Sequence, residues 1–278
     1  MPDTPSSMTE PIGLIAGSRT LPLIFAQQAR RLGPAKVVAV GFDGETDPKL
    51  GASVDELVWI KVGQLGKLIS AFKERGIRRV VMLGQIAPSN LFNVRPDLKA
   101  MTLLLRLKEK NAHTIFGAIA EELDKDGIEL IEATPWLKPV MAPSGIRIGS
   151  ELSAQESDDV RFGYSIAKDV SRREIGQLVV VKEGTVLAVE AFEGTDECLR
   201  RGGELAGKNG GAVAVKVAKE KHDMRFDVPC IGPKTIKVCA EAKVRVLAIE
   251  ADQNVMLEQS EVERLAKKHG ITVLTTRG

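Results

Sequence analysis

The sequence predicts an α/β protein of two domains. The first has an open, mostly parallel sheet with helices on its faces, and the second is mixed and contains a β-hairpin. The length of 278 residues exceeds the usual size of one domain, so we expect two domains of roughly 130 residues each. In the first half, short apolar runs alternate with longer amphipathic ones, which is the pattern of a parallel sheet covered by helices. Residues 138–150 lose this periodicity and gather prolines and glycines, so they are the expected linker.

The first domain is expected over residues 11–137, after a polar, proline-bearing tail at 1–10 that we expect to be disordered. Its expected strands are the apolar runs 12–16, 36–41, 56–62, 79–83 and 128–133. Its expected helices are 22–32, 64–75, 96–110 and 112–126. Three of these helices are followed by a glycine, at the position where glycine ends a helix without strain.

The second domain is expected over residues 151–278. Its expected strands are 177–182, 185–191, 212–218, 244–249 and 271–276. Its expected helices are 155–173, 195–205, one that begins near residue 235 and one that ends at residue 270. The first two strands should form a hairpin around Glu183-Gly184. Ser260 and Glu263 have the spacing of a capping box, which predicts the start of the last helix.

Composition excludes several classes of function. The 39 basic and 37 acidic residues nearly cancel, and no run of lysines or arginines resembles a nucleic-acid-binding tail. Cys198, Cys230 and Cys239 fit neither a disulfide framework nor a four-ligand zinc site, so we expect buried thiols in a reducing, cytoplasmic compartment. No stretch approaches the ~18 apolar residues that span a bilayer, and no amphipathic basic helix stands out. Any contact with a membrane is therefore expected to be peripheral.

A glycine turn in the first domain is a candidate nucleotide site. Gly17, Ser18 and Arg19 lie between an expected strand and an expected helix, where backbone N–H groups can hold phosphate. The turn is neither a dinucleotide fingerprint nor a P-loop, and a plain tight turn has the same sequence. Gly84 and Gln85 end another strand and should lie on the same sheet edge, where open α/β sheets collect ligands. An ordinary loop is again the alternative.

Carboxylates gather where a strand meets a helix in the second domain. Glu190, Glu193 and Asp196 can bind a cation there. Capping of the helix accounts for Thr195 and Asp196 by itself, and a solvated turn would also tolerate the two glutamates. The surrounding residues therefore leave a metal site and a structural turn both open.

The loop 223–229 carries a denser group of charges. In an extended backbone Asp223, Arg225 and Asp227 point to one side. A carboxylate there can hold Mg²⁺, while Arg225 and the nearby Lys216 and Lys219 can neutralise phosphate oxygens. The alternative is a surface Asp–Arg pair. A zinc enzyme and a serine hydrolase are excluded, because spaced histidine ligands and a Gly-x-Ser-x-Gly elbow are both missing.

Taken together, these stretches resemble the LpxI family of UDP-2,3-diacylglucosamine pyrophosphatases, and the similarity covers nearly the whole chain. The stretches that carry it are 13–17 with Leu21-Pro22, then 63–67, 190–196, 225–229, Ile231-Gly232 and Thr235. The resemblance implies Mg²⁺-dependent hydrolysis, with Mn²⁺ as a substitute, in lipid A biosynthesis of a Gram-negative bacterium. The implied products are UMP and 2,3-diacylglucosamine 1-phosphate, formed by attack of water on the β-phosphorus.

The resemblance also implies roles for individual residues. Asp227, in the Arg-x-Asp-x-Pro motif, is the implied essential acid, and we expect it to be a Mg²⁺ ligand because an ordinary carboxylate is a weak base at neutral pH. Asp223 and Arg225 complete the expected catalytic group, and Glu190 is a second expected metal ligand. The expected substrate-binding residues are Gly17, Ser18, Arg19, Gly84, Gln85, Glu193, Gly194, Thr195, Lys216 and Lys219.

Two other functions remain open at this point. One is a pyrophosphatase for another sugar nucleotide, such as UDP-N-acetylglucosamine, and the other is a nucleotide-binding regulator without catalysis. If the chain is a UDP-2,3-diacylglucosamine pyrophosphatase, we expect an amphiphilic UDP-lipid substrate and hydrolysis in a cleft between the two domains. No nucleic-acid partner is expected, and a homodimer is left open.

Overall fold

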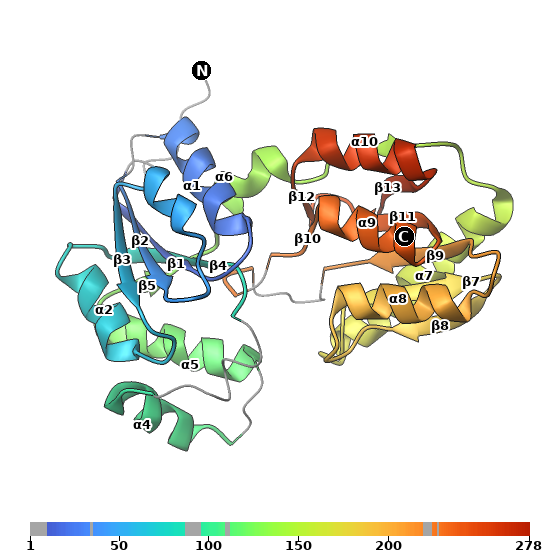
Figure 1. The fold of residues 1–278 in the computed structure, drawn as a ribbon. Coiled ribbons are helices and arrows are strands. Elements are labelled where there is room, and N and C mark those ends of the chain that lie inside the picture. The colour runs from blue at the N-terminus through green and yellow to red at the C-terminus, as the bar shows by residue number, and fades with distance from the viewer. Residues whose placement is uncertain (1–9, 34–35, 87–95, 109–111, 219–223, 227) are drawn as a thin grey trace. The chain divides into compact units, whose positions relative to one another are not determined.

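The computed structural model describes residues 10–33, 36–86, 96–108, 112–218, 224–226 and 228–278. The chain forms two compact units (Figure 1). The first contains the described residues up to Lys138 together with 224–226, and the second contains the rest. Apart from Glu10, the tail expected to be disordered lies outside the described residues.

The first unit is built on a parallel sheet, as predicted. In the described part of the chain its strands are β1 (Ile12–Ala16), β2 (Val37–Phe42), β3 (Glu56–Ile60), β4 (Arg79–Leu83) and β5 (Glu129–Leu130). Their order is β3-β2-β1-β4-β5, and all neighbours are parallel. The strand order therefore reverses between β1 and β4, and such a switch point leaves a crevice beyond the carboxyl ends of these two strands.

Helices cover both faces of this sheet (Figure 1). They are α1 (Leu21–Leu32), η2 (Pro48–Ala52), α2 (Leu65–Lys73), α4 (Leu98–Arg106), α5 (Ala112–Lys125) and α6 (Thr134–Leu137). On one face the fully buried Phe25 of α1 meets Trp136 of α6 with ring centroids 5.5 Å apart. On the other face α2, with the fully buried Phe72, and α5 pack on the strands. Helix α4 contacts α2 and α5 and forms an outer layer.

The second unit contains a mixed sheet, also as predicted. As far as the chain is described, its strands are β6 (Arg147–Ile148), β7 (Leu178–Lys182), β8 (Thr185–Val189), β9 (Ala212–Lys216), β11 (Val244–Glu250) and β13 (Thr272–Thr276). Their order is β6-β13-β11-β9-β7-β8, with β9, β11 and β13 parallel. The predicted hairpin of β7 and β8 is confirmed, and Glu183 and Gly184 both have positive φ at its turn, as a tight hairpin requires. A separate short pair joins β10 (Cys230–Ile231) to β12 (Val255–Met256).

The helices of the second unit also lie on both faces of its sheet. Helix α7 (Ala154–Arg172) covers one face, and α8 (Thr195–Leu205), α9 (Pro233–Glu241) and α10 (Gln259–His269) cover the other. A capping box does occur, but at Ser153 and Glu156 before α7.

Two features of the second unit differ from the sequence analysis. The predicted capping box at Ser260 is wrong, because α10 begins at Gln259. Its N-cap is Glu258, in a left-handed conformation, and Ser260 already lies in the first turn of the helix. Residues 147–148, inside the expected linker, form β6 and pair with β13. Their pairing partner is more than a hundred residues away, so local periodicity does not mark them.

No helix in the described part of the chain is long and apolar enough to cross a bilayer. The three cysteines, all among the described residues, form no disulfide; Cys198 and Cys239 are buried and Cys230 is half-buried.

The burial of two cysteines predicts their reactivity. Burial raises the pKa of Cys198 and of Cys239 to about 12, so at pH 8 roughly one thiol in 10,000 is a thiolate, the form that reacts. Iodoacetamide should alkylate Cys230 first in the folded protein, and all three cysteines at similar rates in urea. Peptide mass spectrometry over time measures this order, and alkylation of Cys198 or Cys239 in the folded state as fast as Cys230 would contradict it.

Candidate functional site

The two glycine turns predicted in the first unit meet at the switch point of its sheet. Gly17 N donates to Leu83 O at 2.8 Å, and Ser18 N donates to Gln85 O at 2.7 Å. Gln85 N donates back to Ser18 O at 3.3 Å, and Ser18 Oγ donates to Gln85 O at 2.7 Å. The residues that follow β1 and β4 are therefore joined into one rigid edge.

Glycine is required on both sides of this contact. A Cβ atom on Gly17 would lie 2.6 Å from Gln85 O. A Cβ atom on Gly84 would lie 2.6 Å from Ser18 O, and Gly84 also has φ +92°, which other residues rarely adopt. The N–H groups of Gly17, Ser18 and Gln85 are engaged within the protein, so they shape this edge. Contacts to a phosphate would come from the residues that follow.

Arg19 and the start of α1 are those residues. Arg19 is exposed and has φ 72°. The Thr20 side chain at the N-cap does not cap the helix, and Pro22 lies in the first turn. The first N–H groups of α1, which carry the positive end of the helix dipole, thus open at the carboxyl edge of the sheet. An anion bound there would meet these groups and the Arg19 side chain.

The same edge carries a shallow pocket that the sequence analysis missed. It has a volume of 460 Å³ and is lined by Asp43, Gly44, Thr46, Pro48 and Trp59. Asp43 directly follows β2, the position at which dinucleotide-binding folds place a carboxylate on ribose. Trp59 is 41% exposed. An acidic residue after the second strand and an exposed tryptophan in the third were the available sequence signals.

In the second unit, hydrogen bonds join three predicted residues, the buried Lys216 and Glu190 and the half-buried Thr195. Lys216 Nζ, at the end of β9, donates to Thr195 Oγ1 at 2.9 Å. Thr195 Oγ1 donates in turn to Glu190 Oε1 at 2.9 Å. The interpretation of Thr195 as a capping residue is wrong, because the N-cap of α8 is Gly194 at φ 83° and the Thr195 hydroxyl is used by Glu190. A Cβ atom on Gly194 would meet nothing within 4 Å, so what calls for glycine here is its φ of +83°, which other residues rarely adopt.

Lys216 is only 5% exposed. Among the described residues its ammonium group has one hydrogen-bond partner, Thr195. An ammonium group has three donors, and burying it is unfavourable unless they are paired. This geometry therefore leaves two buried donors for an anionic group.

Glu193 lies apart from this chain. Its carboxylate accepts hydrogen bonds from Ala191 N at 3.1 Å and from Arg201 Nη2 at 2.6 Å. The hydrogen bond from Arg201 holds the pKa of Glu193 below its usual range. Glu193 thus closes the turn before α8, while Gly194 sets the helix start.

The described residues do not assemble a magnesium site at Glu190. Its Oε1 accepts from Thr195, and its Oε2 accepts from Gln177 N at 3.3 Å. Mg²⁺ requires several oxygen ligands in octahedral geometry, and the described part of the chain contains no group of three or more histidine, cysteine, aspartate or glutamate side chains that could hold a metal. Asp227, the other expected ligand, lies outside the described residues, as do Asp223 and Lys219.

Arg225 is described, and its backbone belongs to the first unit. The guanidinium group of Arg225 lies 5.1 Å from the centroid of the Phe226 ring, within the range of a cation–π interaction. Phe226 packs against the core of the first unit, and its ring centroid is 6.1 Å from that of Phe116 on α5. Three residues of the expected second domain therefore belong by their contacts to the first unit, because Phe226 finds an apolar environment there.

Ala218, the residue before the segment 219–227, is held by a cluster that the sequence analysis did not identify. Ala218 N donates to Glu250 Oε2 at 2.8 Å, and Lys168 Nζ donates to Ala218 O at 3.1 Å. Lys168 also pairs with Glu250 at 2.8 Å, and Tyr164 Oη donates to Glu250 Oε1 at 2.9 Å. Burial and the hydrogen bond to Glu250 raise the pKa of Tyr164 to about 12, so it remains a donor. This set fixes both backbone polar groups of Ala218.

The other end of the segment is also fixed. Val228 is buried, and Val255 N donates to Pro229 O at 2.8 Å at the start of the β10–β12 pair. Residues 219–227, which contain the Arg-x-Asp part of the motif, are thus connected at both ends to well-anchored backbone of the second unit.

We expect replacement of Lys168 by methionine to destabilise the second unit by about 3–5 kcal/mol, since it leaves the carboxylate of Glu250 without its cation. Urea unfolding measures this change. The matched control is Asp252→Asn, which breaks the exposed pair between Asp252 and Arg277 and should cost less than about 1 kcal/mol. Equal effects of the two variants would contradict the anchoring role of the Lys168–Glu250 pair.

Comparison with known proteins covers nearly the whole chain. Residues 11–140 match the family model of the LpxI N-terminal domain, and residues 143–274 match that of the LpxI C-terminal domain. The chain is 31% identical over 277 residues to the UDP-2,3-diacylglucosamine pyrophosphatase LpxI of Caulobacter vibrioides, covering 95% of this chain and 96% of that protein.

Similarity to solved structures is weak. The biotin carboxylase domain of a thermophilic 2-oxoglutarate carboxylase is 15% identical, with a TM-score of 0.26 over 61% of this chain and 34% of that one. The N5-carboxyaminoimidazole ribonucleotide synthetase of Thermotoga maritima is 14% identical, with a TM-score of 0.24 over 67% and 42%. This chain therefore spans less than half the length of either structure.

Proposed function

Because the chain belongs to the LpxI family, we propose that it hydrolyses the pyrophosphate bond of UDP-2,3-diacylglucosamine to UMP and 2,3-diacylglucosamine 1-phosphate. The observation that carries this proposal is the match to the Caulobacter vibrioides pyrophosphatase along 95% of the chain. In our proposal water attacks the β-phosphorus, and the oxygen of that water replaces the bridging oxygen there. The bridging oxygen and its electron pair then leave with UMP.

The first unit supports binding of the nucleotide end. The uncapped start of α1 and Arg19 offer positive charge to a phosphate at the carboxyl edge of the sheet. Asp43 and Trp59 line a pocket on this edge, where a carboxylate can accept from ribose hydroxyls and an indole ring can stack on uracil.

The second unit supports binding of the other phosphate. Lys216 is buried, and Thr195 uses one of its three donors. A pyrophosphate diester is a dianion that repels nucleophiles, so neutralising its oxygens is a large part of catalysis. Among the described residues Lys216 has no carboxylate partner that a phosphate oxygen would displace, which makes it the main anion-binding residue that we assign to this unit.

A divalent cation is part of the proposal, with Mg²⁺ as the cofactor and Mn²⁺ as a substitute. When bound, such an ion would supply charge neutralisation and would activate water. Asp227 is the proposed ligand and Asp223 its neighbour. Glu190 instead holds Thr195, and through it orients the hydroxyl that Lys216 contacts.

The first experiment is UMP release from the diacyl substrate by the Asp227→Ala variant. We expect the rate to fall roughly 10³-fold, because several kcal/mol of charge stabilisation are lost. EDTA should abolish turnover of the unmodified protein, and Mg²⁺ or Mn²⁺ should restore it. Asp252→Ala, which removes an exposed carboxylate, is the control and should retain activity. Near-normal turnover by Asp227→Ala would remove Asp227 from the mechanism.

The same assay separates the alternatives. Turnover of UDP-N-acetylglucosamine as fast as the diacyl substrate would favour a pyrophosphatase for other sugar nucleotides. If no UMP were released under any of these metal conditions, a nucleotide-binding regulator would be the better description.

UMP binding should change the fluorescence of Trp59, since the other tryptophan, Trp136, is only 2% exposed. We expect Arg19→Ala and Asp43→Asn each to weaken UMP binding about tenfold, the effect of losing one hydrogen bond to a charged group. Arg31→Ala, which changes an exposed arginine in the last turn of α1, is the matched control. Titration with UMP followed by fluorescence checks this, and equal affinities of all three variants would contradict the assigned pocket.

A further inference from the structure

Helix α4 exposes an apolar stripe. Leu98 is 77% exposed, Met101 46% and Leu105 81%. Their spacing of three and four residues places them on one face of the helix. The opposite face is also apolar, with Ala100 and Leu103 buried against the first unit. Single exposed leucines are common, but three large apolar side chains in one stripe indicate a surface that meets another apolar phase.

The charges around the stripe have a definite sign. Residues 98–108 contain Lys99, Arg106 and Lys108 and no carboxylate. The carboxylate of Asp97, just before the helix, is engaged at the helix N-terminus. It accepts hydrogen bonds from Ala100 N at 2.9 Å and from Gly66 N at 2.7 Å. The helix is therefore both amphipathic and basic.

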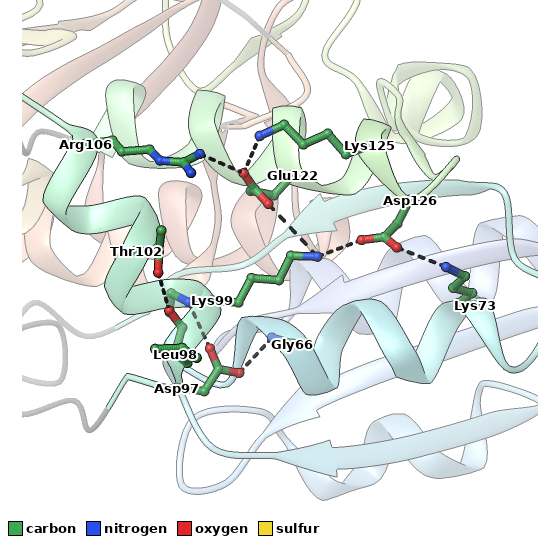
Figure 2. Close-up of polar contacts among 11 residues, drawn as sticks. Gly66, Lys73, Asp97, Leu98, Lys99, Thr102, Arg106, Glu122, Lys125 and Asp126 are labelled. Carbon is green, nitrogen blue, oxygen red and sulfur yellow. Dashed lines mark hydrogen bonds and ion pairs between the residues drawn. The ribbon is translucent and has the colours of Figure 1, made fainter.

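Helices α2 and α5 add Lys73 and Lys125 to the cations of α4 (Figure 2). Among the described residues, Lys73, Lys99, Arg106 and Lys125 surround only two carboxylates, those of Glu122 and Asp126. The two carboxylates are largely covered, with exposed side-chain fractions of 14% and 22%, whereas those of Lys73, Arg106 and Lys125 exceed half. Within this ion-paired cluster the cations therefore outnumber the carboxylates by two, and its most exposed side chains are cations; Glu121 and Asp124 of α5 are also exposed.

The cations also keep both carboxylates ionised. A hydrogen bond from Lys125 lowers the pKa of Glu122, and hydrogen bonds from Lys99 and Lys73 lower that of Asp126. A groove of 530 Å³ lies between the helices, lined by Leu98, Leu103, Arg106 and Lys125 among others. Its floor is apolar and its rim is cationic.

We propose that the α4 stripe, Leu98, Met101 and Leu105 with its rim of Lys99, Arg106 and Lys125, docks the protein on an anionic phospholipid bilayer. The leucines and the methionine would enter the boundary between headgroups and acyl chains, and the cations would meet lipid phosphates. The charge favours this occupant, because a second copy of the chain would bring a second positive rim against the first. The surface goes beyond the proposed hydrolysis and would place the enzyme where an amphiphilic substrate resides.

The test is sedimentation with vesicles, using the full chain. We expect binding to vesicles that contain phosphatidylglycerol and weaker binding to phosphatidylcholine alone, and we expect salt to weaken the former. The double variant Leu98→Ser/Leu105→Ser should bind at least about tenfold more weakly. Leu205→Ser changes a leucine of 59% exposure on α8 and should bind like the unmodified protein. Thermal unfolding should be unchanged in both variants, because the replaced side chains are exposed.

Further measurements identify results that would overturn the proposal. Equal vesicle binding by the double variant and the unmodified protein would do so, as would the absence of binding to either vesicle. UMP release from detergent-dispersed substrate should persist in the double variant. Its loss would assign the stripe to the acyl chains of the substrate instead. A dimer that the double variant disrupts, seen by light scattering, would assign the stripe to a second copy. Failure of UMP release by the unmodified protein would reject the hydrolase proposal and leave vesicle binding to be judged alone.

Discussion

The central strands of both sheets are buried on two faces, and this constraint decides where polar chemistry can lie. All residues of β1 and β9 are buried, so a charged side chain within them would be unpaired in the core. Charges are admitted towards the ends of such strands, and parallel strands bring their carboxyl ends to one edge. Lys216 and Glu250 are the last residues of β9 and β11, and Glu190 directly follows β8.

The two buried charged clusters of the second unit differ in how completely they are paired. Glu250 receives Lys168, Tyr164 and Ala218 N, so its oxygens are satisfied by the protein. The Lys216 ammonium group donates to one hydroxyl, that of Thr195, among the described residues. A satisfied cluster stabilises the backbone that it holds, whereas an incompletely paired buried cation gains most when an anion arrives. This difference is our reason for treating Glu250 as an anchor and Lys216 as a binding residue.

Local pattern predicted the fold class, the hairpin and most strands, because burial on two faces leaves continuous apolar runs in the sequence. It also located Gly17 and Gly84, whose meeting follows from the ends of adjacent strands. It missed features that depend on distant partners, such as β6, the inward turn of Thr195 and the hold of Glu250 on Ala218. It also missed the basic amphipathic character of α4, because Leu103, Leu104 and Leu105 are consecutive and hide which of them is exposed.

The segment that carries Arg225 is held by residues that flank it and by one residue within it. Ala218 and Val228 are fixed within the second unit, while Phe226 packs in the core of the first. A loop attached only at its ends would lose much conformational entropy on ordering its charged side chains. An aromatic anchor in its middle means that part of this cost is met in folding, before any ligand binds. Phe226 therefore holds the neighbouring Arg225, whose guanidinium group lies over its ring, with the first unit.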